Sequence, residues 1–210
     1  MTFDDAAAWA ARLDIAERDE WLQPETVVKE VIGPLAVAAT AGSGEAAVVA
    51  DIGAGTGYFT VRLAAALPAA TVLATDTEAG MREYLAERCR TAGLANVRVG
   101  PAGDSRMGLP RAAHVALMCT VYHHLPNRVP YLRASAGVDL VPGGYVVVIE
   151  HKTGDLPIPT PPPAMRFERS TIVAEFEEAG YAVVGAPAFL PYFNILVFRA
   201  PLPPALAVEL

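Results

Sequence analysis

A carboxylate followed by three closely spaced glycines, Asp51-Ile-Gly53-Ala-Gly55-Thr-Gly57, is the segment of this sequence best suited to ligand binding. Glycines allow a tight turn in which a ligand contacts the backbone, and the free N–H groups of a following helix add a positive end. The carboxylate lies two positions before the first glycine, where it repels a pyrophosphate and attracts an ammonium group. The segment therefore predicts a ligand that carries an ammonium group and no phosphates.

The same glycines do not fit the dinucleotide-binding fingerprint G-x-G-x-x-G. In the register that starts at Gly53, Tyr58 stands where the third glycine is required, and in the register that starts at Gly55, Thr60 stands there. An NAD-dependent oxidoreductase is therefore a less favoured alternative. A tight turn without any ligand is also less favoured, because a second acid, Asp76, accompanies the glycines.

From about Val48 to Arg199 the sequence resembles the class I S-adenosylmethionine (SAM)-dependent methyltransferases, which have a Rossmann-like fold. The resemblance is carried by the glycine run, by Asp76 twenty-five residues after Asp51, and by the turn Leu140-Val-Pro-Gly-Gly-Tyr145. SAM has an ammonium group and no phosphates, as the glycine run requires. The resemblance implies that SAM is the cofactor and S-adenosylhomocysteine the product.

The resemblance also implies which residues contact the cofactor. Asp76 would accept hydrogen bonds from both ribose hydroxyls, since a carboxylate offers two acceptor oxygens, and Asp104 would accept one from the adenine amino group. Asp76 can in addition cap the helix that follows it. The expected cofactor-binding residues are Asp51, Gly53, Ala54, Gly55, Gly57, Asp76, Thr77, Met81, Gly103, Asp104, Ser105 and Thr120.

Tyr122, His123 and His124 follow the fourth expected strand, at the end that borders the methyl-transfer centre in this family. An imidazole titrates near neutral pH and can remove a proton from a substrate O–H or N–H group. At most one of the two adjacent histidines is expected to face the site as a general base, and a structural role for the pair stays open. The substrate pocket is expected to contain Tyr122, His123 and Trp21. No metal is expected, because the acids and histidines lack ligand spacing.

The hydrophobic pattern predicts the elements that position these residues. Short β-type runs alternate with helical stretches, which indicates an α/β fold with a mainly parallel sheet and helices on both faces. Seven strands are expected, at residues 47–51, 71–75, 96–99, 114–119, 145–150, 181–184 and 192–199. Helices are expected over residues 59–67, 81–89, 132–140 and 172–179.

The chain is expected to form one main domain with an N-terminal addition. Residues 1–45 form a helical cap, residues 46–200 the SAM-binding domain and residues 201–210 a C-terminal tail. The cap is expected to be helical from about Asp4 to Ala41. Its segment Arg12–Val28 resembles the helices that cover the cofactor in some small-molecule methyltransferases, although a solvated helix is an alternative. Prolines between residues 151 and 167 predict an exposed connection.

The composition argues against several other classes of protein. A net charge of −7 and the lack of a Lys/Arg cluster disfavour a nucleic-acid partner. No apolar run reaches the ~18–20 residues of a membrane span. The acidic N-terminus also lacks the features of a signal peptide, so a cytoplasmic location without a membrane partner is expected. Cys89 and Cys119 are expected to be small buried side chains rather than a disulfide.

These features together predict a SAM-dependent methyltransferase (EC 2.1.1 class) that methylates an O, N or C nucleophile of a small molecule. A non-catalytic SAM-binding or regulatory domain is the main alternative, because its cofactor site would look the same. The sequence does not determine the methyl acceptor, the pathway or the oligomeric state.

Overall fold

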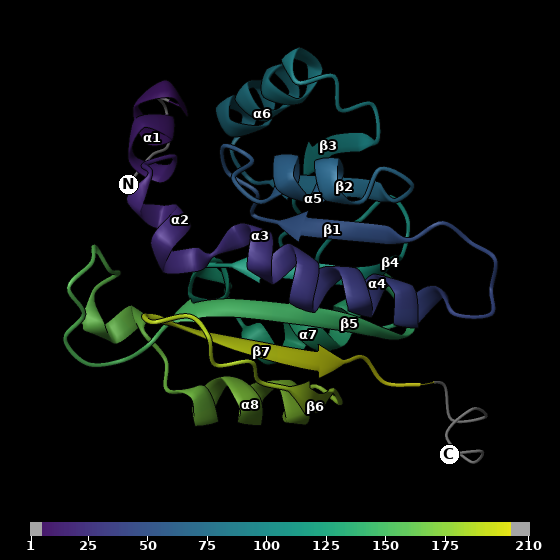
Figure 1. The fold of residues 1–210 in the computed structure, drawn as a ribbon. Coiled ribbons are helices and arrows are strands. Elements are labelled where there is room, and N and C mark those ends of the chain that lie inside the picture. The colour runs from purple at the N-terminus through teal and green to yellow at the C-terminus, as the bar shows by residue number, and fades with distance from the viewer. Residues whose placement is uncertain (1–5, 203–210) are drawn as a thin grey trace.

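The computed structural model describes residues 6–202, with side chains from residue 8 onward. Its centre is a seven-stranded sheet with the strand order β3-β2-β1-β4-β5-β7-β6 (Figure 1). β1 pairs in parallel with β2 and β4, β2 with β3, and β4 with β5, whereas β7 is antiparallel to β5 and β6. The predicted Rossmann-like, mainly parallel sheet is confirmed. The strands are β1 (Val48–Ile52), β2 (Thr71–Asp76), β3 (Val97–Pro101), β4 (Ala113–Cys119), β5 (Leu140–His151), β6 (Ala182–Gly185) and β7 (Phe193–Arg199).

The order of the strands reverses its direction at β1. β2 and β3 are added on one side of β1, and β4 and β5 are added on the other side. In open parallel sheets the loops on either side of such a switch point diverge and leave a crevice at the carboxyl ends of the strands. The glycine turn after β1 and the segment after β4 meet at this crevice.

Two apolar cores cover the two faces of the sheet. Successive strand residues point to opposite faces, so that Val147 and Ile149 of β5 belong to one core and Val146 and Val148 to the other. The strands are thus buried on both faces, as expected for a parallel sheet between two helical layers. The first core is covered by η1 (Val28–Ile32), α4 (Gly33–Thr40), α5 (Thr60–Ala66) and α6 (Ala79–Thr91), and the second by α7 (Arg128–Ser135) and α8 (Arg169–Glu178).

The N-terminal region consists of several short helices. α1 (Ala6–Leu13), α2 (Glu17–Leu22) and α3 (Pro24–Val27) precede η1, a π-helical turn, and α4. The chain bends at Gln23, which has a φ of 41°, and Pro24 begins the next helix, where its missing N–H is not needed. The region predicted to be helical is therefore divided into several helices, and its first residues, 4 and 5, lie outside the described residues.

Two predicted boundaries near β5 are wrong. The helix predicted over residues 132–140 ends at Ser135, and Leu140 begins β5. The segment Pro142-Gly-Gly144, predicted as a turn, lies within β5, where the pairing with β4 jumps from Ala113↔Leu140 to Val115↔Tyr145. The extra residues form a bulge, and Gly143 supports it with a φ of +71°.

The connection between β5 and α8 is less exposed than its prolines predict. It contains one short 3-10 turn, η3 (Pro163–Met165), but Ile158 is buried and belongs to the first core. Cys89 is buried, Cys119 is half-buried, and neither forms a disulfide. Among residues 6–202 no helix has both the length and the apolar character that a membrane crossing needs. Residues 203–210 of the predicted tail lie outside the described residues.

Candidate functional site

Asp51 is a buried acid in β1, two positions before Gly53, the first glycine of the turn. Its side chain is 3% exposed, and its Oδ2 accepts a hydrogen bond from the Thr60 hydroxyl at 2.6 Å. Burial raises the pKa of Asp51 to about 7; the Thr60 hydrogen bond opposes this increase and the negative charge of Asp76 adds to it. A cation that enters the site therefore meets a carboxyl group poised to lose its proton near neutral pH.

The three glycines of the turn all have positive φ angles, 65° at Gly53, 55° at Gly55 and 88° at Gly57. A Cβ atom on Gly57 would lie 2.1 Å from Leu85 Cδ1, and one on Gly53 would lie 2.5 Å from Val121 Cγ2. Close packing therefore requires glycine at these two positions. A Cβ on Gly55 would have only Leu13 Cδ1, at 3.8 Å, as a neighbour, so Gly55 is the glycine with open space above it.

Asp76 ends β2 and lies against the glycine turn. Its Oδ2 accepts a hydrogen bond from the Gly55 amide at 2.8 Å, and its Oδ1 accepts one from the Glu78 amide at 2.9 Å. The predicted capping role of Asp76 is wrong, because the N-cap residue of α6 is Glu78 and no side chain caps this helix. The parallel pairing of β1 and β2 brings together the two acids that are 25 residues apart in the sequence.

A pocket lies at the switch point, between the glycine turn, the end of β4 and the N-terminal helices. Thr120 follows β4, is half-buried and has a φ of 55°, a strained backbone angle for a residue other than glycine. A hydrogen bond from its amide to the Ile149 carbonyl, at 2.8 Å, stabilises this conformation. Five predicted residues line the pocket: Asp51, Gly53, Ala54, Gly55 and Thr120. Five residues that the sequence analysis did not assign to the site also line it: Leu13, Arg18, Thr56, Phe59 and Cys119.

The predicted adenine-binding segment lies outside the lining of this pocket but beside Asp76. The Ala102 amide donates to the Asp76 carbonyl at 3.1 Å, which places the next residues on the same edge of the sheet. Asp104 and Ser105 are exposed there, and Gly103 packs against Gly108. Their contact with adenine stays a prediction.

Thr77 and Met81, also predicted near the nucleoside, differ in exposure. Thr77 is exposed, and its carbonyl accepts a hydrogen bond from Arg82 at 2.8 Å. Met81 is buried, at 2% exposure, on α6. Neither residue lines the pocket, so their contact with the nucleoside also stays a prediction.

The two histidines after β4 have different surroundings within the 3-10 turn η2 (Tyr122–His124). His123 is buried, and its Nδ1 lies 2.9 Å from Glu150 Oε2 and 3.0 Å from Oε1. His124 is exposed, its ring centre is 4.1 Å from that of His123, and its pKa is lowered by partial burial and by the neighbouring histidine. Only His123 therefore has a carboxylate that fixes its ring.

None of the three residues predicted in the substrate pocket, Tyr122, His123 and Trp21, lines this pocket, and the contact of His123 with a substrate stays a prediction. Tyr122 and Trp21 pack elsewhere. The Tyr122 side chain is fully buried in the second core, where its ring stacks on Phe176 and its hydroxyl hydrogen-bonds to Glu175. Trp21 is half-buried on α2 and packs against the first core. The structure places both side chains in the apolar packing of the protein rather than around the pocket.

The thiol of Cys119 lines the pocket. Burial raises its pKa to about 12, with a smaller opposing effect from the positive charge of Arg18. The group is therefore a neutral, apolar wall of the pocket at neutral pH. Within residues 6–202 there is no group of three or more His, Cys, Asp or Glu side chains that could hold a metal ion.

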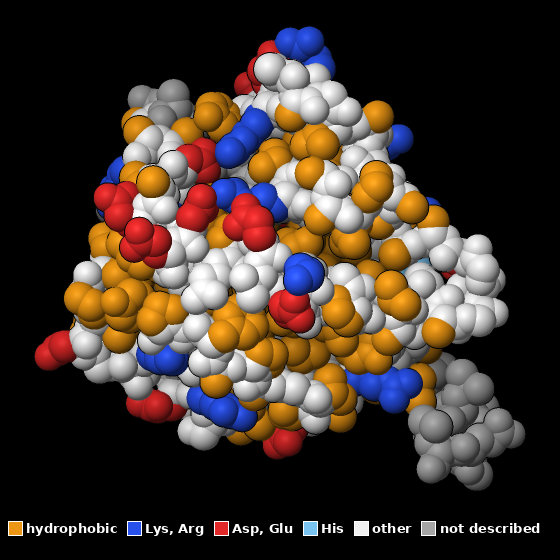
Figure 2. All heavy atoms as spheres, in the orientation of Figure 1, with side chains coloured by type: hydrophobic (Ala, Val, Ile, Leu, Met, Phe, Trp, Pro, Cys, Tyr) orange, Lys and Arg blue, Asp and Glu red, His pale blue; other side chains and the backbone are white. Residues whose placement is uncertain are grey.

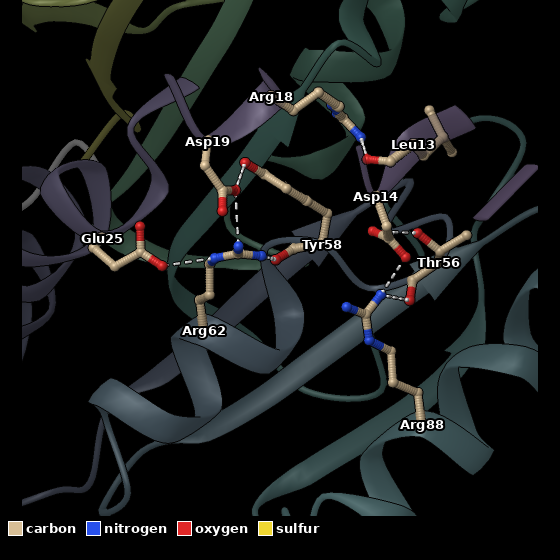
Figure 3. Close-up of polar contacts among 9 residues, drawn as sticks. All are labelled: Leu13, Asp14, Arg18, Asp19, Glu25, Thr56, Tyr58, Arg62 and Arg88. Atoms are coloured by element: carbon tan, nitrogen blue, oxygen red, sulfur yellow. Dashed lines mark hydrogen bonds and ion pairs between the residues drawn. The ribbon is translucent and has the colours of Figure 1, made fainter. Parts of the chain in front are cut away.

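Residues 13–25, which we call the lid segment, are held over the glycine turn by two groups of ionic contacts (Figure 3). In the first, Asp14 Oδ2 accepts a hydrogen bond from Arg88 of α6 at 2.8 Å, and Asp14 Oδ1 accepts one from the Thr56 hydroxyl at 3.3 Å. Arg88 also donates to the Thr56 carbonyl at 3.0 Å. This group joins the lid segment, the glycine turn and α6.

The second group joins the lid segment to α5. Asp19 Oδ1 accepts hydrogen bonds from the Tyr58 hydroxyl at 2.5 Å and from Arg62 at 2.8 Å, and Glu25 binds Arg62 at 2.9 Å. Burial, and then the hydrogen bond to Asp19, raise the pKa of Tyr58, so its hydroxyl stays protonated as a donor. Figure 2 shows acidic and basic side chains gathered over this part of the surface. The lid segment therefore depends on charge pairing.

Glu150, which the sequence analysis did not assign to the site, had a signal in the sequence, whereas the orientation of Arg18 had none. Glu150 is near the end of a strand next to β4, so the rule that parallel strands share a carboxyl edge would have placed it near His123. Arg18 lies in the segment predicted to cover the cofactor, but nothing in its spacing indicates that it faces inward. Its position follows from the way the lid segment packs.

The comparisons with known proteins agree with this geometry. Residues 49–144 match a family model described as a methyltransferase domain. A search of the curated proteins finds no match. A SAM dependent methyltransferase from Aquifex aeolicus has a similar structure, with a TM-score of 0.79 and 24% identity over 93% of this chain and 98% of that chain.

Two further solved structures share the fold. The cyclase SpnF has a TM-score of 0.64 and 15% identity over 82% of this chain and 80% of its own. The mitomycin 7-O-methyltransferase MmcR has a TM-score of 0.61 and 20% identity over 92% of this chain and 66% of its own. At these identities the likeness shows the fold and does not transfer a substrate.

Proposed function

We propose that this chain is a class I SAM-dependent methyltransferase that transfers a methyl group from SAM to an O, N or C nucleophile of a small molecule, and the match of residues 49–144 to a methyltransferase domain supports this. S-adenosylhomocysteine is then the second product. The negative net charge disfavours a nucleic-acid substrate.

The hydrogen bond between the Gly55 amide and Asp76 is the observation that carries the proposal. It joins the glycine turn of β1 to the acid of β2, and the pocket beside this turn contains Asp51. The two carboxylates fit SAM: Asp51 suits an ammonium group, and Asp76 suits a pair of ribose hydroxyls. The carboxylate of Asp51 in the pocket lining repels a pyrophosphate.

When bound, SAM supplies a methyl carbon that is activated by the positive sulfonium sulfur. The task of the protein is then to align a nucleophile with that carbon and to exclude water, and positioning alone can contribute about 7–11 kcal/mol. Thr120 and the neutral thiol of Cys119 form a wall of the pocket, and Leu13 covers the turn from the lid segment. These groups exclude water without competing as nucleophiles.

His123 is the histidine that we assign as the general base, and its contact with Glu150 supports this choice over His124. A carboxylate beside Nδ1 favours the tautomer with the proton on that nitrogen, which leaves the lone pair on Nε2. Nε2 can then accept the proton of an acceptor O–H or N–H group as the methyl group is transferred. Glu150 would stabilise the resulting imidazolium.

Binding tests the cofactor and product formation tests the reaction. We expect SAM to raise the midpoint of thermal unfolding and NAD to leave it unchanged. A panel of phenols, amines and carboxylates, assayed for S-adenosylhomocysteine release, identifies the acceptor class. Stabilisation by NAD but not by SAM would contradict the proposal, whereas SAM binding without turnover on any acceptor would favour the non-catalytic SAM-binding alternative. The test of turnover is needed because a cyclase also has this fold, so the fold alone does not imply methyl transfer.

Single variants of the two histidines test the base. We expect His123→Ala to lower kcat about 100- to 10,000-fold and to remove the corresponding limb of the pH–rate profile. His124→Ala is the matched control, because it removes the same side chain from the same turn, and it should keep kcat within a few-fold. A fully active His123→Ala variant with an unchanged pH–rate profile would remove His123 from the mechanism.

A further inference from the structure

His151, the last residue of β5, is a buried histidine with an unused ring nitrogen. It is 8% exposed, and its ring lies against Phe193 of β7, with the ring centres 4.5 Å apart. Its Nδ1 has no hydrogen-bond partner among the described residues. A buried polar atom without a partner lowers the stability of the protein, so a ligand group that completes the pairing would be favoured there.

Arg166 is a second side chain with an unused buried atom in the same region. It follows η3 in the connection between β5 and α8, and its Nη1 donates to the carbonyl of Gly154, shortly after His151. Its Nε is buried without a hydrogen-bond partner in the described part of the chain. No acid whose side chain is described forms an ion pair with Arg166, so its positive charge is available to a ligand.

Positive groups from three elements act on the end of β5. Burial lowers the pKa of His151 to about 4, and the positive charges of His123, Arg166 and Arg18 lower it further. A hydrogen bond to the Pro159 backbone has the opposite effect. The three groups come from η2, the connection and α2, and Figure 1 shows the connection and α2 at the same edge of the sheet. The imidazole is therefore neutral at neutral pH and has cations around it.

An anion suits this place better than a cation or a neutral group. A carboxylate can accept hydrogen bonds from the Arg166 guanidinium in one plane. Its negative charge would also favour a proton on His151 Nδ1, which would then become a second donor. Neither residue lines the pocket at the glycine turn, whereas the charge of His123, the proposed base, acts on His151. The anion therefore belongs to the methyl acceptor rather than to the cofactor.

We propose that the methyl acceptor carries a carboxylate and that Arg166 and His151 bind it. This inference rests on the proposed function, since it names the class of acceptor for that reaction. The acceptor is then a hydroxy acid or an amino acid, whose carboxylate anchors it while its O–H or N–H group faces His123. The primary amide of the same compound keeps the shape but lacks the charge.

Calorimetric titration of the full chain, saturated with S-adenosylhomocysteine, tests the inference. The probes are the hydroxybenzoates, the aminobenzoates and lactate, each paired with its primary amide. We expect the wild type to bind at least one acid about 10-fold or more tighter than its amide. Arg166→Gln and His151→Phe should each raise the Kd of that acid about 10- to 100-fold, as for the loss of a charged hydrogen bond. The Kd of its amide should change less than about 3-fold.

Matched variants separate contact from overall charge and from folding. Arg169→Gln removes the same charge from the exposed first residue of α8, and it should leave the preference for the acid unchanged. Arg166→Lys keeps the charge and should recover part of the preference. His151→Phe keeps a ring against Phe193 and removes both ring nitrogens. Circular dichroism and the thermal unfolding midpoint of each variant show whether the fold is intact.

The outcomes distinguish this inference from the proposed function. Equal binding of acids and amides by the wild type, or no binding of any acid, would overturn the inference, while methyl transfer to a neutral acceptor would leave the proposed function standing. The Kd of S-adenosylhomocysteine should change less than about 3-fold in Arg166→Gln and His151→Phe. A loss equal to that for the acid would assign both residues to the cofactor and overturn the inference. If the wild type bound no SAM, the proposed function would fail and this inference would fail with it.

Discussion

The buried carboxyl group of Asp51 makes the stability of the empty protein depend on pH. Its pKa is about 7 in the folded protein and 3.8 in the unfolded reference. Between these values the folded state keeps a proton that the unfolded state has released. Stability therefore falls as pH rises from about 4 to about 7 and is constant with respect to this group above that range.

The size of the effect follows from the two pKa values. One pKa unit corresponds to 1.36 kcal/mol, so the difference between the folded and unfolded pKa values corresponds to about 4 kcal/mol in the free energy of unfolding. Between pH 5 and pH 8, where the experiment is practical, the same two values give a loss of about 3 kcal/mol. Asp51→Asn removes the titration and can still accept the hydrogen bond from the Thr60 hydroxyl. The loss of stability that the buried asparagine amide itself causes does not depend on pH.

Urea unfolding of both proteins without ligand at pH 5 and pH 8 measures this effect. We expect the free energy of unfolding of the wild type, relative to Asp51→Asn, to decrease by about 3 kcal/mol between the two pH values. Subtracting the free energy of unfolding of the variant from that of the wild type removes the contributions of all groups that titrate alike in both proteins. A difference that stays constant with pH would refute the assignment of a raised pKa to Asp51.

A second variant tests the cause of the pKa. Thr60→Val removes the hydrogen bond that lowers the pKa of Asp51 while keeping the side-chain shape. The midpoint of the Asp51 carboxyl carbon signal in an NMR titration should therefore move to higher pH. Saturating SAM should move it to lower pH, because an ammonium group stabilises the charged form. Movement in the opposite direction in either case would contradict the electrostatic account.

Three other variants have distinct expected outcomes. Gly57→Ala should lower the free energy of unfolding by about 2–4 kcal/mol, since its Cβ would clash with Leu85 at a φ of 88°; urea unfolding measures this. Gly55→Ala causes no such clash, so it should lower the free energy of urea unfolding by only about 1 kcal/mol. In calorimetry, however, it should weaken SAM binding at least 10-fold. Equal losses of stability in the two glycine variants would contradict this. Tyr122→Phe should lose about 1–2 kcal/mol of stability through the hydrogen bond to Glu175 while kcat stays within a few-fold; a large loss of kcat would restore Tyr122 to the pocket.

The sequence determined the fold to a large extent, because its signals are local. Each buried strand is a short apolar run, and Gly53, Gly55 and Gly57 are needed where the backbone has positive φ. The parallel strands then bring their carboxyl ends to one edge, so Asp76 could be expected beside the turn without knowledge of any distance. The boundary errors near Leu140 arose where a bulge, which has no local signature beyond its glycines, replaced a turn.

The tertiary structure decided which side chains face the pocket. Arg18 faces it because Asp14, Asp19 and Glu25 bind α5, α6 and the glycine turn, and these partners are 37 to 74 residues away in the sequence. His123 and Tyr122 are adjacent in the chain, yet one is fixed by Glu150 and the other fills a core, because a 3-10 turn sends successive side chains in different directions. Residue type and spacing specify which chemistry is available. Only the packing of distant segments fixes which of those groups meet.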